Sequence, residues 1–266
     1  MDRVETTFNE TWIELPAGER VYAHVHRPIM KGRYPGVLLV PGGFGSGTDL
    51  DTSPGLTPDD ISSLGFTVLH YDPSGRGRTG GEEDFWGPRH QRELAGVLKH
   101  LARLSNVDEE NLGVFSFSIG IVISTGALSR FPKPRVRYLY DWEGPSNRFV
   151  TTKNDTMEQL RPFHTSNEGF WREREASRFI GDLECAYFRY QALTDHVQGT
   201  FKGHAIELLN LATRGKAAWT RCNDNPVNTL FDESRLEDYH WVPETLNNRG
   251  QILKYLLEIQ TQAQGL

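Results

Sequence analysis

Short apolar runs alternate with helix-like segments along most of the chain, and this alternation restricts the fold more than any other feature. The runs typical of buried strands are residues 36–40, 67–71, 112–117, 136–142, 186–192 and 217–222. The segments with helical periodicity or helix signals are residues 57–64, 89–104, 119–131, 201–214 and 243 to about 261. This alternation predicts an α/β fold, with a mostly parallel central sheet covered by helices on both faces.

The start of the chain has a different pattern. Residues 11–15 and 20–27 have the character of strands, and a Pro-Ala-Gly turn at 16–18 joins them. Apolar side chains alternate from Val21 to Val25, as in a strand with one buried face. We therefore predict that an antiparallel hairpin begins the sheet.

The composition fits one large domain, residues 1–266, because 37% hydrophobic residues are enough to bury a full core. A net charge of -6 without a run of Lys or Arg argues against nucleic acid or a membrane as the partner, and favours a small molecule. Signal-peptide and membrane-span patterns are absent, and Cys185 and Cys222 lack metal-ligand spacing. We expect a cytoplasmic protein with no cofactor and no metal, and the oligomeric state stays open.

Ser118 lies where an apolar strand, residues 112–117, meets an apolar helix without a spacer. At such a turn the hydroxyl points out of the sheet, and the Ile119 amide is free to stabilise a developing negative charge. The turn requires small neighbours, which here are Ser116 and Gly120. The pattern predicts a nucleophile with one oxyanion donor, although an ordinary strand–helix join with a serine gives a similar string.

A glycine-rich loop, residues 41–47, follows the strand at 36–40. Its bare backbone lets a substrate carbonyl approach the amide of Gly43 or Phe44, which would complete the oxyanion hole. The alternatives are a structural turn and a phosphate loop. No lysine follows the glycines and Asp51 adds negative charge nearby, so a phosphate loop is disfavoured.

A second dense turn, residues 72–81, follows the strand at 67–71. We predict that its role is structural. Asp72 is expected to tie the loop together and Arg76 to meet a carboxylate.

The segments 36–47, 72–81 and 108–120 resemble those of the α/β-hydrolase superfamily, specifically the branch with dienelactone hydrolases, acyl esterases and prolyl-oligopeptidase-type peptidases. They come in the family's order and at ordinary spacing. The resemblance covers roughly residues 11–222, except for 143–184, and implies an α/β-hydrolase fold with helices on both faces of the sheet.

The sequence departs from the family pattern in two places. Ser116 stands where the family most often has glycine, and its Cβ crowds the turn slightly. Pro41 stands where many members have histidine, and this change leaves the backbone donors in place.

The resemblance also implies the order serine, acid, histidine along the chain. It implies Ser118 as the nucleophile and an acid just beyond the strand at 186–192, where Asp195 lies. A carboxylate there can orient an imidazole and stabilise its cation. Asp141 and Glu143, at the end of the preceding strand, are the reserve acids.

Three histidines, His196, His204 and His240, follow Asp195. His196 adjoins Asp195 and is expected to point elsewhere, and His204 falls on the apolar stripe of a helix, as a packed residue does. His240 comes just before the terminal helix, where the fold usually carries its base. We predict His240 as the base, so that the triad is Ser118, Asp195 and His240.

Residues 143–184 match no family motif and are rich in aromatic and charged residues. Alternating charges are typical of a solvated helix face, and the aromatic residues are typical of a packed cap. We predict a small cap insertion over the sheet end. The predicted walls of the substrate pocket are Trp142, Phe44 and Trp171.

These features predict a carboxylesterase-like serine hydrolase that cleaves a small-molecule ester through an acyl-enzyme intermediate. The backbone amides of Gly43, Phe44 and Ile119 would form the oxyanion hole. A peptidase or amidase of the same fold is the first alternative. A catalytically degenerate hydrolase fold used for binding is the second, because the sequence leaves His204, or no working base at all, as alternatives to His240.

Overall fold

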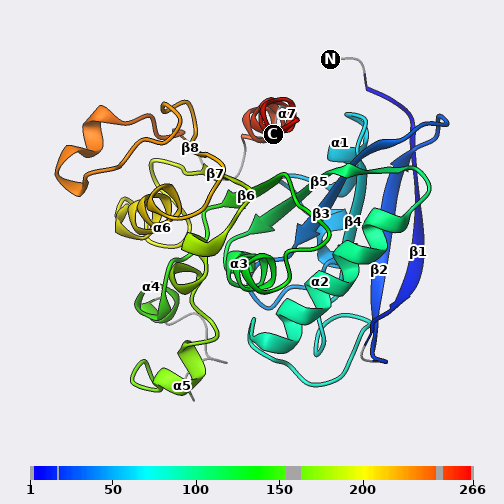
Figure 1. Ribbon diagram of the computed structural model, residues 1–266, viewed down its shortest axis with the longest axis horizontal. Coiled ribbons are helices and arrows are strands. Elements are labelled where there is room, and N and C mark those ends of the chain that lie inside the picture. The colour runs from blue at the N-terminus through cyan, green and yellow to red at the C-terminus, as the bar shows by residue number, and fades with distance from the viewer. Residues whose placement is uncertain (1–2, 17, 154–162, 244–247, 265–266) are drawn as a thin grey trace.

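The computed structural model describes residues 3–16, 18–153, 163–243 and 248–264 (Figure 1). An eight-stranded sheet with the order β1-β2-β4-β3-β5-β6-β7-β8 forms its centre. The strands are β1 (Thr6–Glu14), β2 (Arg20–Pro28), β3 (Tyr34–Val40), β4 (Thr67–Tyr71), β5 (Val107–Phe117), β6 (Tyr138–Trp142), β7 (Ala186–Tyr190) and β8 (Thr220–Cys222). β2 pairs antiparallel with β1 and with β4, and all other pairs are parallel.

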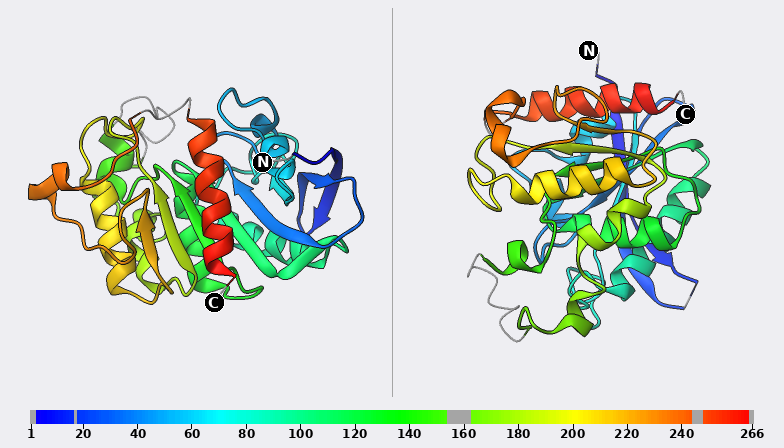
Figure 2. Two further views of the ribbon diagram at one scale, coloured as in Figure 1. Left: turned by 90° about the horizontal axis from the view of Figure 1, so that it is seen from above. Right: turned by 60° about the vertical axis from the view of Figure 1, so that its left-hand side comes forward.

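Helices cover both faces of the sheet. The longer helices are α2 (Pro88–Arg103), α3 (Gly120–Arg130), α6 (Gly203–Arg214) and α7 (Arg249–Ala263), and α1 (Pro58–Ser62) is shorter. α2, α3 and α6 pack on one face of the sheet and α1 and α7 on the other (Figures 1 and 2). Each face of the sheet has its own apolar core beneath these helices. The predicted α/β fold, with its N-terminal hairpin, is confirmed.

Local sequence explains where these elements begin. Thr57 and Asp60 form a capping box at the start of α1, with Pro58 in the first turn. On β2, Val21, Ala23 and Val25 face the core under α2, while Tyr22 and His24 point to the opposite face of the sheet. The predicted helix from residue 243 begins later, at Arg249, and residues 244–247 lie outside the described part of the chain.

The parallel strands bring four connecting segments to one edge of the sheet. Val40 of β3 pairs with Ser116 of β5, and Phe117 of β5 pairs with Trp142 of β6. Trp142 in turn pairs with Tyr190 of β7. The segments that follow these strand ends therefore start side by side, as ligand-binding segments do in open α/β sheets.

Residues between β6 and β7 form α4 (Arg148–Lys153), α5 (Glu168–Trp171), η3 (Ala176–Arg178) and η4 (Ile180–Asp182). They lie on the same side of the sheet as α3 and α6 (Figures 1 and 2). Arg148 holds this segment together through ion pairs with Glu168 and Glu175, at 2.7 and 2.9 Å. The described helices include none with the length and apolarity that a membrane crossing requires.

Candidate active site

Ser118 occupies a sharp turn between β5, which ends at Phe117, and α3, which begins at Gly120. Its φ is +50°, a conformation that non-glycine residues seldom adopt and that costs about 1–3 kcal/mol. A Cβ on Gly120 would lie 2.8 Å from the Pro41 carbonyl oxygen, and one on Gly42 would lie 3.1 Å from the Ser118 Cβ. The predicted turn is confirmed, and the glycine-rich loop after β3 lies directly against it.

Ser116, the departure from the family pattern, fits without disturbing the turn. Its side chain is fully buried, and its hydroxyl donates a hydrogen bond to the Tyr140 carbonyl at 3.3 Å. The hydroxyl is therefore satisfied by the neighbouring strand β6, which removes the cost of burying it.

The imidazole of His196 lies between Ser118 and Glu143. Its Nε2 is 2.8 Å from the Ser118 Oγ, and its Nδ1 is 2.8 Å from the Glu143 Oε2. A carboxylate only accepts hydrogen bonds, so Nδ1 carries the proton and Nε2 is free to accept one from the serine hydroxyl. These contacts form a Ser–His–Glu arrangement of the kind that activates a serine.

Glu143 is held rigidly. Its side chain is fully buried, it has a φ of +53°, and its Oε1 accepts a hydrogen bond from the Ala192 amide at 3.0 Å. Trp142 stacks on the His196 ring with centroids 4.7 Å apart. The imidazole is thus fixed by a carboxylate at one nitrogen and by an indole on its face, while a third of the side chain stays exposed.

The structure corrects two of the three predicted triad residues. His240 is exposed, the side chains of Asn223 and Asn225 bind its backbone, and no hydrogen bond among the described residues joins its ring to Ser118. Asp195 is buried, but its Oδ2 accepts a hydrogen bond from His204 at 3.1 Å rather than from His196. The reserve acid Glu143 holds the place predicted for Asp195.

Asp195 instead organises the loop that carries His196. Its Oδ1 accepts hydrogen bonds from the amides of Val197 and Gln198, at 2.8 and 2.7 Å. Burial alone would raise the pKa of Asp195, but the hydrogen bonds from His204 and Gln198 outweigh it and hold the pKa well below the usual range. An ionised Asp195 therefore holds the backbone of this tight loop and links it to His204 on α6.

The second reserve acid, Asp141, is occupied by a buried ion pair. It lies 2.5 Å from Arg189, its partner in register on β7, and both side chains are fully buried. The Asp141 carboxylate also accepts hydrogen bonds from Tyr187 at 2.8 Å and from the Gly144 amide at 2.9 Å. Asp141 therefore supports the turn that follows Glu143 and does not reach the serine.

The glycine-rich loop after β3 is held in place by Arg76, of the turn at 72–81, and by Trp86. Trp86 Nε1 and Arg76 Nη1 donate hydrogen bonds to the Gly43 carbonyl, at 2.9 and 3.1 Å. Because the peptide is trans, the Phe44 amide points the opposite way from this carbonyl. Within the described residues the amides of Phe44 and Ile119 donate to no other group, so both remain available for a substrate oxygen.

The structural roles predicted for the turn at 72–81 are confirmed. Asp72 accepts hydrogen bonds from the amides of Thr48 and Arg78, at 3.0 and 2.8 Å. Arg76 forms two hydrogen bonds with the Glu83 carboxylate, at 2.7 and 2.8 Å. This turn therefore sets the position of the glycine-rich loop.

Partly exposed aromatic rings continue from this loop into the segment after β6. Phe44 packs against Phe85 with centroids 6.0 Å apart, Phe85 against Phe163 at 4.7 Å, and Phe163 stacks on Phe170 at 4.0 Å. Trp171, predicted as a pocket wall, has no exposed surface and binds the His164 carbonyl. Its place in the pocket is corrected, because it belongs to the core of the segment.

The described residues include one group able to hold a metal ion, formed by His24, His26, Asp51 and His70. These residues belong to β2, η1 (Thr48–Thr52) and β4, and none of them contributes to the contacts around Ser118. A metal site was not expected at these positions from the sequence.

The strand order, the sharp turn at Ser118 and the adjacent glycine-rich loop are those of the α/β-hydrolase fold. An esterase of Pyrococcus furiosus is similar over 96% of this chain and 91% of its own, with a TM-score of 0.68 and 13% identity. A Klebsiella pneumoniae protein assigned as a dienelactone hydrolase is similar over 97% and 99%, with a TM-score of 0.65 and 15% identity. Neither protein-family models nor curated protein sequences give a match.

A third similar structure is a puromycin-hydrolysing peptidase of Mycobacterium tuberculosis. The TM-score is 0.70 at 15% identity, and the similarity covers 97% of this chain but 39% of the peptidase. The chain thus corresponds to part of that longer protein. All three similarities establish the fold.

Proposed function

We propose that this protein is a serine hydrolase that cleaves carboxylic esters of small molecules through an acyl-enzyme intermediate. One observation carries the proposal: the His196 imidazole lies 2.8 Å from both the Ser118 hydroxyl and the Glu143 carboxylate. Such a chain of contacts is the minimum that general-base activation of a serine requires.

In the first half-reaction His196 Nε2 accepts the Ser118 proton as Oγ attacks the ester carbonyl. The carbonyl oxygen gains a negative charge and is stabilised by the amides of Phe44 and Ile119, each contributing about 2.7–4 kcal/mol. The imidazolium then donates its proton to the leaving alkoxide. This sequence leaves the acyl group on Ser118.

In the second half-reaction a water molecule takes the place of the alcohol. His196 removes its proton, the hydroxide attacks the acyl carbonyl, and the same amides stabilise the second tetrahedral intermediate. Glu143 stabilises the imidazolium in both halves through its contact with Nδ1. The acid product leaves and Ser118 regains its proton.

The aromatic surface supports a substrate with an apolar group. Phe44 lies in the loop that supplies an oxyanion donor, and Phe85, Phe163 and Phe170 extend the partly exposed apolar surface away from it. Trp142, stacked on the His196 ring, adds a further aromatic surface beside the base. We propose an aromatic or aliphatic ester, bound with its apolar part along these rings.

A fluorophosphonate probe tests the nucleophile directly. The wild-type protein should be labelled at Ser118, as shown by mass spectrometry of the labelled peptide, because the probe reacts with serines activated by a base. Ser118→Ala should lose the label, whereas Ser116→Ala, two residues away, should retain it. Absence of labelling in the wild type would contradict the proposal and favour a binding role for the fold.

A peptidase or amidase is the second candidate, because one of the similar structures is a puromycin-hydrolysing peptidase. The two functions differ in the leaving group, since an amine needs proton transfer from His196 more than an alkoxide does. We expect kcat/KM for aryl and alkyl esters to exceed that for matched amides and N-blocked peptides. Comparable turnover of matched amides would move the assignment to the peptidase class.

A further inference from the structure

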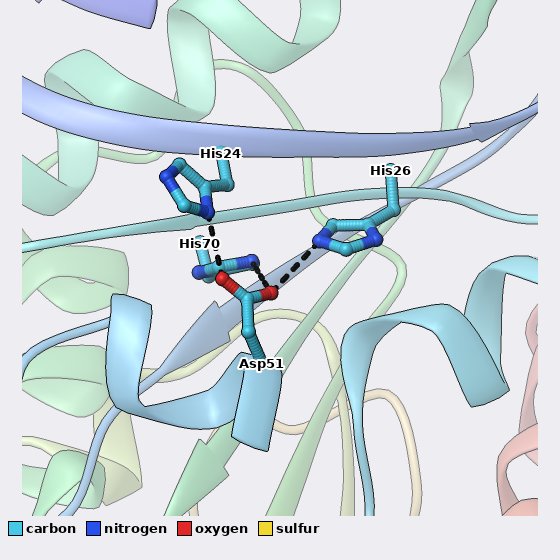
Figure 3. Close-up of side chains that lie close together, drawn as sticks. All are labelled: His24, His26, Asp51 and His70. Atoms are coloured by element: carbon cyan, nitrogen blue, oxygen red, sulfur yellow. Dashed lines mark hydrogen bonds and ion pairs between the residues drawn. The ribbon is translucent and has the colours of Figure 1, made fainter. Parts of the chain in front are cut away.

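A compact group of three histidines and one aspartate lies on the sheet face beneath α1 (Figure 3). His24 and His26 are two residues apart on β2 and so share a face, and His70 of β4 pairs in register with His24. Asp51 of η1 points at all three rings, with N···O distances of 2.7, 2.9 and 3.1 Å. The group thus joins three segments that are distant in sequence.

We propose that these four side chains bind one divalent ion of the zinc class. Three imidazole nitrogens and one carboxylate oxygen are a donor set that Zn²⁺ takes in proteins. The four donor atoms all lie within 4.8 Å of one another. Donors around a tetrahedral ion with bonds of about 2.0–2.2 Å lie about 3.4 Å apart, so the group needs only a small adjustment to enclose an ion.

His70 shows most clearly that the group lacks a partner. Its side chain is completely buried, and neither ring nitrogen has a hydrogen-bond partner of acceptable geometry among the described residues. Its Nε2 nevertheless points into the group, 3.1 Å from the Asp51 Oδ1. A buried polar nitrogen without a partner costs free energy, and coordination to an ion removes that cost.

Tyr22 is a second partner of His24. The Tyr22 hydroxyl donates a hydrogen bond to the Glu10 carboxylate and accepts one from Arg78 Nη1. The same oxygen lies 3.1 Å from His24 Nε2. A second partner of this kind is typical of metal-binding histidines, because it orients the ring and sets the tautomer.

His24 Nδ1 lies 2.7 Å from one Asp51 carboxylate oxygen, and His26 Nε2 lies 2.9 Å from the other. A ring N–H can fill each of these contacts as a hydrogen bond, and a metal ion can take the place of those protons. Measured metal binding separates the two cases.

Four protein donors fill a tetrahedral coordination shell, so the ion would act on structure rather than on a substrate. Phe8 of β1 stacks on His26 with centroids 5.3 Å apart and covers the group from outside. Asp51 follows the glycine-rich loop by a few residues, and Ser46 of that loop binds Asp49 of the same η1 segment at 2.8 Å. The ion would therefore fix the segment that anchors this loop to the edge of the sheet.

Metal binding to the full chain tests the site without reference to turnover. We expect protein stripped with a chelator to take up about one equivalent of Zn²⁺ in isothermal titration calorimetry. At 100 times Kd, Zn²⁺ should raise the melting temperature by roughly 5–10 °C. Co²⁺ should give the visible absorption of a tetrahedral complex, and Mg²⁺ should have no effect, since it prefers oxygen ligands.

Variants locate the ion. Asp51→Asn and His26→Gln should abolish the Zn²⁺-dependent rise in melting temperature, and Tyr22→Phe should weaken binding about 10- to 100-fold. His100→Gln on α2 is the matched control and should bind as wild type does. If Zn²⁺ binds equally to wild type, Asp51→Asn and His26→Gln, or does not bind to folded wild type, the proposal is wrong.

Discussion

Replacing His196 with alanine should lower kcat for ester hydrolysis by about 10⁶-fold, the largest loss we expect from any single change outside Ser118. The reason is geometric: the His196 Nε2, 2.8 Å from Oγ, is the base that the structure offers to Ser118. Without it the hydroxyl keeps its proton, and the remaining catalysis comes from the oxyanion donors and from binding. Pre-steady-state and steady-state kinetics with an activated aryl ester measure the loss.

His240→Ala is the matched control for this prediction. His240 was the base expected from the sequence, but it is exposed and lies in a loop whose backbone is held by two asparagines. We expect its replacement to leave kcat within a few-fold of wild type. A large loss in His240→Ala with normal rates in His196→Ala would show that the contacts around Ser118 are not those of catalysis.

The second large effect is expected from Glu143→Gln, which should lower kcat by about 10⁴-fold with little change in KM. The amide is nearly isosteric and should keep the contact with the Ala192 backbone. It can no longer stabilise the imidazolium, however, and its NH₂ group favours the wrong tautomer of His196. The loss is smaller than for His196→Ala because the base remains present.

Asp195→Asn is the comparison that separates a catalytic acid from a residue that supports a loop. Asp195 anchors the loop of His196 through two backbone amides and His204, so its replacement should loosen that loop and lower the melting temperature. We expect its effect on kcat to be much smaller than that of Glu143→Gln. The reverse order would restore Asp195 as the acid.

The fold followed from the sequence because its signals are local. The apolar runs that became β3, β4 and β5 are buried on both faces, and the positions of α2 and α6 agree with their apolar stripes. The turn at Ser118 was likewise encoded nearby, since a strand, a small residue and a helix follow one another directly. Neighbouring residues decide such features, and no distant contact is needed.

The acid and the base depended on distant contacts. His196 adjoins Asp195 in the sequence, and this excludes only Asp195 as its hydrogen-bond partner. A signal for Glu143 was nevertheless present: Arg189 lies within an otherwise apolar strand, and a buried arginine needs a buried carboxylate. Once Asp141 is assigned to Arg189, Glu143 is the acid left at that strand end.

The histidine group at β2 also has a signal in the sequence. Val21, Ala23 and Val25 form the apolar face of the strand, and the other face carries His24 and His26. Their spacing places two imidazoles on one surface. Only the fold, however, shows that His70 and Asp51 join them.

Phe117 and Trp142 are paired residues of adjacent parallel strands, and each is followed at once by a proposed catalytic residue, Ser118 or Glu143. The separation between nucleophile and acid is therefore set by the spacing of the sheet, which does not change when surface segments do. His196, in contrast, lies further along its connecting segment, between β7, which ends at Tyr190, and α6, which begins at Gly203. Insertions or exchanges in that segment would displace His196 without displacing Ser118 or Glu143, so we expect changes there to alter reactivity most readily.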